Sequence, residues 1–249
     1  MNDGAEDTFI SHLVELRDRL LRIIGAVLLV FLCLAYWASD IYSLLARPLL
    51  AALPTGGSMI ATDVVGVFLV PVKVTLLVAF LIALPYVLHQ VWAFVAPGLY
   101  SHEKRLAVPL IVTSSLLFFI GMAFAYFVVF PSIFRFMAAI APEGVAWMTD
   151  IEKYFSFVLT MFLAFGATFE TPVAVVLLVR MGLVTVEKLK QARAYVIVGA
   201  FVIGAVFTPP DVISQLLLAL PLCLLYEVGI WVARLVAPAP DAEAAAEVK

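Results

Sequence analysis

The chain has 249 residues, of which 65% are hydrophobic and 13% charged, and its mean hydropathy is +1.12. A soluble domain of this length cannot bury so much apolar surface, so the composition predicts an integral membrane protein. A formal net charge of −3 without a sustained basic face argues against nucleic-acid binding.

The N-terminal region is polar before it becomes apolar. Residues 1–7 include three acids and no basic segment or nearby small-residue cleavage site, so we expect no cleaved signal peptide. An amphipathic helix should follow, because apolar side chains recur there at helical spacing. Its apolar face holds Phe9, Leu13, Leu16 and Leu20, and its polar face holds His12, Glu15, Arg17 and Arg19.

Six apolar blocks then follow, and most reach the ~20 residues that a membrane-spanning helix requires. They lie at 20–38, 67–95, 106–130, 154–179, 195–207 and 212–236. We therefore predict an all-α integral membrane protein with six transmembrane helices, of which the fifth and sixth are short. A single transmembrane domain should cover residues 1–236, and the Ala-, Pro- and Glu-rich residues 237–249 should form a disordered cytoplasmic tail.

Lysine and arginine are distributed unevenly between the two ends of these helices. The end that includes the N-terminus carries Arg17, Arg19, Arg22, Lys104, Arg105, Arg180, Lys188, Lys190, Arg193, Arg234 and Lys249. The other end carries Arg47, Arg135 and Lys153, with Lys73 just inside a helix. The positive-inside rule therefore predicts that both termini lie in the cytoplasm.

The segment between the first two blocks, residues 39–65, begins with leucines and isoleucine at helical spacing. We expect an amphipathic cap on the outer face, which ends where Pro54, Gly56 and Gly57 break the helix. Pro48 should bend this cap or fix how it meets the membrane. The simplest role for the whole segment is structural.

Prolines interrupt three of the predicted spans, at Pro85, Pro172 and Pro221. Each removes a backbone donor and frees the carbonyl four residues earlier, which bends the helix. We expect kinked helices that form a concave bundle. The alternative is ordinary kinking, which is common in membrane helices.

Glu170 lies inside the fourth apolar block, beside Thr168 and Pro172. A carboxylate near the centre of a membrane helix costs about 3 kcal/mol on insertion scales, so a functional role is the first hypothesis. The alternative is a polar group that a neighbouring helix satisfies. Together with Gln215 in the sixth block, Glu170 and Thr168 are candidates for polar contacts with a partner helix.

The fifth block is too short to cross an unperturbed bilayer upright, because thirteen residues at about 1.5 Å each fall well below a ~30 Å hydrocarbon core. Residues 208–211 (TPPD) should make a tight turn after it, with Asp211 as the cap of the sixth helix. Ala200 and Gly204, four positions apart, would let another helix approach closely.

Two further carboxylates lie at the predicted cytoplasmic surface, Glu15 on the N-terminal helix and Glu103 after the Pro97-Gly98 turn. Together they are able to accept a cationic ligand. The alternative is that each pairs with a nearby arginine or lysine on a solvated face.

Four strings carry a resemblance to a known family: residues 12–19 (HLVELRDR), the loop 94–105, residues 169–172 (FETP) and residues 208–211 (TPPD). In this order and spacing they resemble the TatC subunit family of the twin-arginine protein translocase. The similarity runs from about Phe9 to Arg234.

The resemblance implies a receptor of the bacterial cytoplasmic (inner) membrane, which binds twin-arginine signal peptides of folded cargo and is driven by the proton-motive force. It implies single-span partner subunits of the TatA and TatB type, in a hetero-oligomer with several copies embedded in the lipid bilayer. It assigns the paired arginines of the signal to Glu15 and Glu103, while Phe94 and Leu99 contact the apolar part of the signal and Arg17 orients Glu15. Two carboxylates suit the planar guanidinium fork better than an ammonium.

Two other classes of function compete with this one. A proton- or ion-coupled transporter would use Glu170 as its titrating site, but such folds usually show repeated halves, and the sequence has no internal repeat. An enzyme is not expected, because His102-Glu103 lacks the second histidine of a zinc-protease motif and no other catalytic motif appears. Cys33 and Cys223 lie within apolar blocks and have no metal spacing. We therefore expect no catalytic residue, metal or cofactor.

Overall fold

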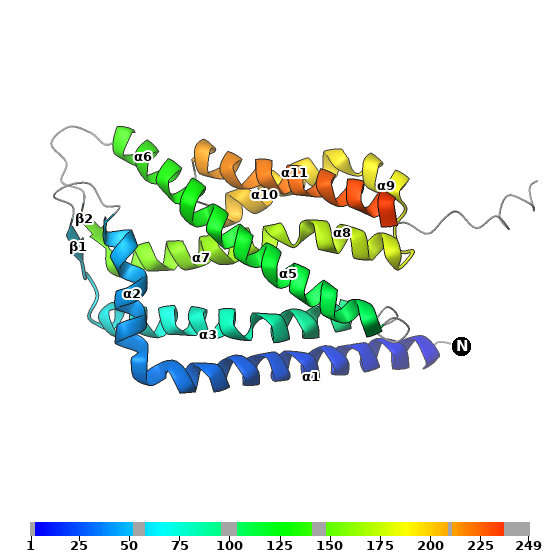
Figure 1. Ribbon diagram of the computed structural model, residues 1–249, viewed down its shortest axis with the longest axis horizontal. Coiled ribbons are helices and arrows are strands. Elements are labelled where there is room, and N and C mark those ends of the chain that lie inside the picture. The colour runs from blue at the N-terminus through cyan, green and yellow to red at the C-terminus, as the bar shows by residue number, and fades with distance from the viewer. Residues whose placement is uncertain (1–2, 52–57, 96–103, 141–147, 209–210, 237–249) are drawn as a thin grey trace, which may run out of the picture. The chain divides into compact units, whose positions relative to one another are not determined.

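The structure is a computed structural model that describes residues 3–51, 58–95, 104–140, 148–208 and 211–236. Nearly all of these residues are helical (Figure 1). The helices are α1 (Asp3–Leu34), η1 (Ala35–Trp37), α2 (Ala38–Ala51), α3 (Val64–Val95), α5 (Lys104–Phe124), η2 (Ala125–Val129), α6 (Phe130–Ile140), α7 (Ile151–Phe169), α8 (Thr171–Arg180), α9 (Val186–Gln191), α10 (Arg193–Phe207) and α11 (Val212–Val236). The predicted tail, residues 237–249, lies outside the described residues.

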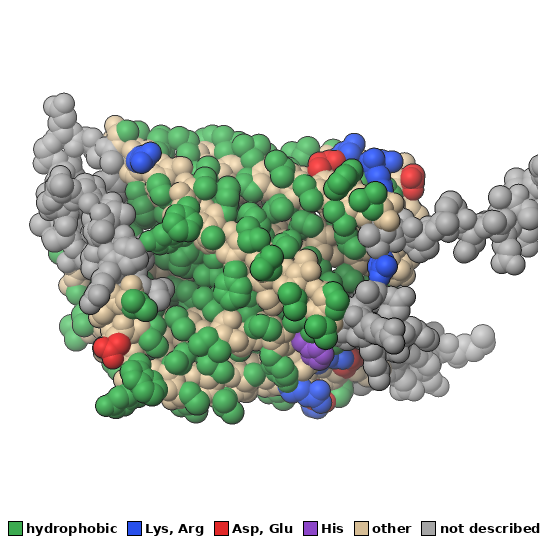
Figure 2. Space-filling model, in the orientation of Figure 1, with side chains coloured by type: hydrophobic (Ala, Val, Ile, Leu, Met, Phe, Trp, Pro, Cys, Tyr) green, Lys and Arg blue, Asp and Glu red, His purple; other side chains and the backbone are tan. Residues whose placement is uncertain are grey.

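Five helical stretches of the described chain are long and apolar enough to cross a membrane. They are Ser11–Leu44, Val64–Val95, Val108–Met137, Ile151–Arg180 and Val212–Leu235. On the face shown in Figure 2, hydrophobic side chains cover the middle of the helices, and charged side chains gather near helix ends. This distribution is the one that a lipid environment selects.

The chain divides into two compact units. Unit 1 consists of Met1–Ser115 and Phe130–Leu163, and unit 2 consists of Leu116–Val129 and Ala164–Lys249. That residues 1–236 form one domain with a concave bundle stays a prediction.

In unit 1, α1 and α2 both pack on α3. The predicted amphipathic helix and the first span form one continuous helix of 32 residues, α1, which runs beside α3 in the opposite direction (Figure 1). Leu13, Leu16 and Leu20 are 48%, 43% and 51% exposed. Unit 1 therefore does not bury the apolar face of α1, which is left for lipid or another chain.

The core of unit 1 contains a cluster of aromatic rings from α6 and α7. The ring of Phe130 lies 6.2 Å from Phe134, 6.0 Å from Phe157 and 5.4 Å from Phe162, and Phe134 stacks on Tyr154 at 5.7 Å. Ring pairs at these separations are attractive beyond the area they bury. They fix α6 against α7 without polar groups.

In unit 2, α11 packs on α8, α9 and α10. A buried apolar cluster joins three of these helices: Val175, Val179, Val186, Leu189, Tyr226, Ile230 and Ala233. Gly229 lets α8 and α11 meet closely, because a Cβ there would lie 3.0 Å from the Cα of Pro172. Tyr226 also donates its hydroxyl hydrogen to the carbonyl of Leu189 at 2.8 Å, which ties α11 to α9.

Two glycines allow a closer crossing in unit 2. A Cβ at Gly121 of α5 would lie 2.5 Å from the carbonyl oxygen of Phe165 on α7. A Cβ at Gly166 would lie 2.5 Å from ring atoms of Phe118. Real Cβ atoms do not approach so closely, so glycine is required at both positions.

The observed helix lengths bear on three predictions about spans and prolines. The fifth span is short as predicted, because α10 has 15 residues. The prediction of a short sixth span is wrong, since α11 has 25 residues and continues through Pro221. The helix expected after the first span exists as α2, which continues through Pro48, and α3 likewise continues through Pro85.

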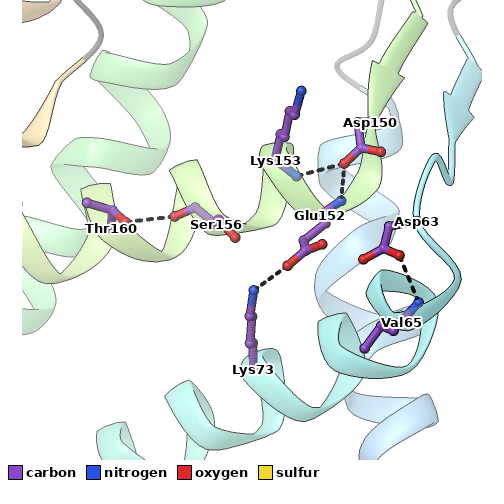
Figure 3. A network of polar contacts seen from close by, with 8 residues as sticks. All are labelled: Asp63, Val65, Lys73, Asp150, Glu152, Lys153, Ser156 and Thr160. Atoms are coloured by element: carbon purple, nitrogen blue, oxygen red, sulfur yellow. Dashed lines mark hydrogen bonds and ion pairs between the residues drawn. The ribbon is translucent and has the colours of Figure 1, made fainter.

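The sequence did not predict any strand, yet β1 (Ser58–Ile60) and β2 (Met148–Asp150) form a two-stranded parallel sheet. Strands of three residues are too short to show a clear alternation. Beside this sheet, Lys73 of α3 donates to Glu152 Oε1 of α7 at 2.7 Å (Figure 3). This ion pair joins the two helices.

Asp150 ends β2 and organises the start of α7. Its Oδ1 accepts the amide hydrogens of Glu152 and Lys153 at 2.9 and 3.0 Å (Figure 3). Its Oδ2 accepts hydrogen bonds from the amide and the hydroxyl of Thr62. The hydroxyl of Thr62 first, and then the amide of Lys153, lower the pKa of Asp150 from 3.8 to about 2. Asp150 therefore links the two strands to α7 as an ionised carboxylate.

We expect protonation of Asp150 to loosen this region. A depressed carboxyl pKa contributes stability that is complete above the unfolded pKa near 3.8 and is lost as the pH falls through about 2. Hydrogen exchange at the amides of Thr62 and Lys153 should therefore stay slow above about pH 4 and quicken, beyond the intrinsic rate, toward pH 2. In Asp150→Asn, the amides of Thr62 and Lys153 should exchange rapidly at every pH in this range. Asp63→Asn, which changes an acceptor for the Val65 amide alone, is the control; equal effects of both variants would contradict the assignment.

Candidate functional site

Glu15 of α1 forms an ion pair with Arg19, one helical turn later. Arg19 Nε and Nη2 lie 2.8 and 2.6 Å from the same oxygen, Glu15 Oε1. Arg19 Nη1 donates to Oε1 of Gln90 on α3 at 3.2 Å. Because Gln90 is only 6% exposed, a buried side chain of a second helix holds the guanidinium and, through it, the carboxylate. Pairing with a nearby arginine is what the alternative interpretation of Glu15 predicted.

A stacked pair of rings lies beside this carboxylate. The ring centroids of His12 on α1 and Phe94 on α3 are 4.4 Å apart, with an angle of 17° between their planes. His12 Nδ1 lies 3.9 Å from Glu15 Oε2. The structure therefore brings together Glu15 and Phe94, two of the predicted signal-binding residues, although the sequence separates them by most of α1 and α3.

Arg17 has a different neighbour from the predicted one. Its Nε and Nη2 donate to Oδ1 of Asp18 at 3.0 and 2.8 Å, and both side chains are exposed. The structure places Arg19, and not Arg17, against Glu15, because residues four apart share a helix face and residues two apart do not. Glu103 and Leu99, the other two predicted signal-binding residues, lie outside the described residues.

Glu170 lies at a break between two helices of unit 2. It is the residue between the end of α7 and the start of α8, and its side chain makes no capping hydrogen bond to α8. Both of its carboxylate oxygens are shielded from solvent. The break agrees with the bend expected at Pro172, which occupies the first turn of α8.

The carbonyl that Pro172 frees is satisfied locally. The Thr171 hydroxyl donates to the carbonyl oxygen of Thr168 at 2.6 Å. Thr168 itself is 6% exposed. Its backbone carbonyl thus has a donor within the same chain, so a partner helix is not needed to supply one.

Gln215 on α11 is used within unit 2. Its Nε2 donates to the carbonyl oxygen of Phe201 on α10 at 2.8 Å, and a Cβ at Gly204 would lie 3.0 Å from its Cγ. Ala200, 1% exposed, packs in the same α10–α11 contact. The close approach expected at Ala200 and Gly204 is therefore made by α11. Asp211 caps α11 as predicted, since its Oδ1 accepts the amide hydrogen of Ser214 at 2.7 Å.

Comparisons with known proteins decide the family. Residues 11–221 match the family model described as Sec-independent protein translocase protein (TatC). The chain belongs to the TatC family. The protein with that name in Escherichia coli K12 is 57% identical over 233 residues, which are 93% of this chain and 90% of that protein. The one in Haemophilus influenzae Rd is 52% identical over 243 residues, 98% of this chain and 95% of that protein.

A solved structure agrees with this assignment. A crystal structure of the twin arginine translocase receptor TatC is 40% identical in sequence, with a TM-score of 0.78 over 90% of this chain and 98% of that chain. The resemblance stated from the four sequence strings is confirmed. The chain is a multi-pass membrane protein of the Tat protein-transport pathway.

Membership in the TatC family, a family of translocase components, sets aside the ion-coupled transporter that Glu170 alone suggested. The sequence interpretation missed the contribution of Arg19 and Gln90 to the site. The spacing of Glu15 and Arg19 contains the signal for their pair. No such signal exists for Gln90, which lies 71 positions from Arg19 and reaches it only through the packing of α1 on α3.

Gln215 offers a test of whether it supports the fold. We expect Gln215→Leu to lower the stability of the protein by about 1 kcal/mol, because the carbonyl of Phe201 loses its donor. Gln215→Glu should cost more, since it sets a carboxylate against that carbonyl. Thermal unfolding in detergent measures both variants. Gln191→Leu on the exposed end of α9 is the control, and two unchanged melting temperatures at position 215 would show that the bond contributes nothing.

Proposed function

We propose that this TatC-family chain is the receptor subunit of its translocase. It binds the twin-arginine signal peptides of folded cargo proteins at the cytoplasmic face of the bacterial inner membrane. Family membership supports this, and so does the solved relative, which is named a twin arginine translocase receptor. The proton-motive force drives export, and the chain itself performs no chemistry.

The proposed topology has six spans with both termini in the cytoplasm. Five long apolar helices and the shorter α10 supply the spans. The lysines and arginines in the first half of α1, at the start of α5, in and around α9 and near the end of α11 support this orientation. In this topology the Glu15 site faces the cytoplasm.

The observation that carries the receptor function is the arrangement around Glu15. Its carboxylate is held in place by Arg19 and Gln90, beside the ring of Phe94, at the meeting point of α1 and α3. A guanidinium bound there has a fixed anion and an adjacent apolar surface for the rest of the signal. Glu103 supplies the second carboxylate in this proposal, while Leu99 and Phe94 contact the apolar part of the signal.

Single-span subunits of the TatA and TatB type are the proposed partners, in a hetero-oligomer with several copies. The position of Glu170 inside a membrane segment, at the break between α7 and α8, supports a polar contact with such a helix. The buried Thr168 lies in the same break. The side-chain Nε2 of Gln215 donates within unit 2, so its side-chain Oε1 is the atom proposed to contact a partner.

Peptide binding tests the receptor function directly. The detergent-solubilised chain, without other subunits, is titrated with a labelled signal peptide that contains paired arginines. The matched peptide has paired glutamines and keeps the same apolar segment. We expect the arginine peptide to bind at least tenfold more tightly, because two charge-assisted contacts are lost with glutamine. Equal affinities would show that the chain does not recognise the paired arginines.

A further inference from the structure

The two oxygens of the Glu15 carboxylate have different surroundings. Oε1 accepts both hydrogen bonds from Arg19, at 2.8 and 2.6 Å. Within the part of the chain that the structure describes, the basic group near Oε2 is His12 Nδ1 at 3.9 Å, which is longer than a hydrogen bond. Oε2 therefore retains its capacity to accept a hydrogen bond from a ligand.

A ligand does not readily displace Arg19 from Oε1. Its Nη1 is anchored on Gln90, which is 6% exposed, and the Arg19 side chain itself is only 20% exposed. Displacing it would move a charged group away from two partners at once, which costs more than leaving it in place. The internal arginine thus bonds to Oε1 and does not compete for Oε2.

His12 is the ring next to Oε2. Phe94 covers one side of it in a nearly parallel stack, and the His12 side chain is still 53% exposed. A planar cation that hydrogen-bonds to Oε2 lies within reach of the exposed part of this ring. Guanidinium groups stack on aromatic faces, whereas a hydrated ammonium gains less from a flat surface.

We infer that the stacked pair of His12 and Phe94 is a platform for the guanidinium that Glu15 Oε2 binds, and that His12 makes this position selective for arginine over lysine. The inference rests on the proposed receptor function and deepens it. It assigns the recognition of one signal arginine to three side chains from two helices: Glu15, His12 and Phe94. Arg19 and Gln90 are positioning residues for the first of these.

Two signal peptides, one with paired arginines and one with paired lysines, test the inference on the full-length chain in detergent. His12→Leu should weaken the arginine peptide by about two- to fivefold and leave the lysine peptide nearly unchanged. His12→Phe keeps a ring at this position and should retain the selectivity of the wild type. Thermal unfolding of each variant shows whether it remains folded.

Each other outcome counts against a defined part of the proposal. If His12→Leu weakens both peptides equally, or if His12→Phe behaves like His12→Leu, His12 is structural and the platform is wrong. If Arg19→Met tightens the arginine peptide, then Arg19 competes for the carboxylate and Oε1 is the ligand atom. If the wild type fails to prefer paired arginines over paired glutamines, the receptor function itself fails, and the platform fails with it.

Discussion

Replacing Glu15 by glutamine is expected to weaken the binding of a paired-arginine signal peptide by roughly 10- to 100-fold. Hydrogen bonds to charged groups contribute about 1.5–3 kcal/mol each, and a neutral amide at this position loses the charge that makes the contact strong. The amide also offers a donor where the guanidinium needs an acceptor. Titration of the labelled peptide into the purified variant measures the effect.

The same helix offers a matched control in Asp18. It is an exposed acid that pairs with Arg17, so Asp18→Asn removes the same unit of charge three positions away. If only general electrostatic attraction held the peptide, both variants would lose the same amount of affinity for it. The site proposed here predicts that Asp18→Asn changes the affinity by less than about twofold, as is usual for an exposed ion pair. An unchanged affinity of Glu15→Gln would remove Glu15 from the site.

Gly121→Ala should strongly destabilise unit 2. The new Cβ would lie 2.5 Å from the carbonyl oxygen of Phe165 and 2.9 Å from its carbonyl carbon, which are backbone atoms and cannot turn away. The helices must separate, and overpacking of this kind costs about 1–3 kcal/mol or more. This outweighs the gain of about 1 kcal/mol that alanine brings to a helix. Thermal unfolding in detergent should show a clearly lowered transition.

Gly199 provides the comparison, because it lies in α10 where the Cβ of an alanine would meet nothing within 4 Å among the described residues. Gly199→Ala should keep or raise the melting temperature, since only the helix propensity changes. If Gly121→Ala and Gly199→Ala melted alike, the close crossing of α5 and α7 would not limit the stability of unit 2.

Local regularities allowed much of the molecule to be predicted. The break beside Glu170 agrees with the bend predicted at Pro172, whereas α3 and α11 continue through Pro85 and Pro221. The Asp211 cap followed equally from a short acidic side chain before an apolar helix, and the structure has both features. The length of the fifth apolar block predicted the short helix α10. The prediction of a short sixth span was wrong, because α11 has 25 residues.

Contacts between residues far apart in the sequence could not be predicted from it. Neither the parallel pairing of β1 with β2 nor the Lys73–Glu152 ion pair has a local signal, because their partners lie about eighty to ninety positions apart. The use of Gln215 inside unit 2 depends on how closely α10 and α11 approach at Gly204. The sequence pattern equally allowed a contact with another chain.

Hydropathy, charge and proline act on the chain locally, so the amino-acid sequence was enough to predict a membrane protein and the positions of most of its helices. The surroundings of Glu15 depend instead on tertiary packing. The packing of α1 on α3 sets Gln90 against Arg19 and Phe94 against His12. One oxygen of the carboxylate thereby bonds to Arg19, and in the proposed site the other accepts the ligand. Hydrogen-bond geometry depends on positions in space that no spacing along a single helix encodes.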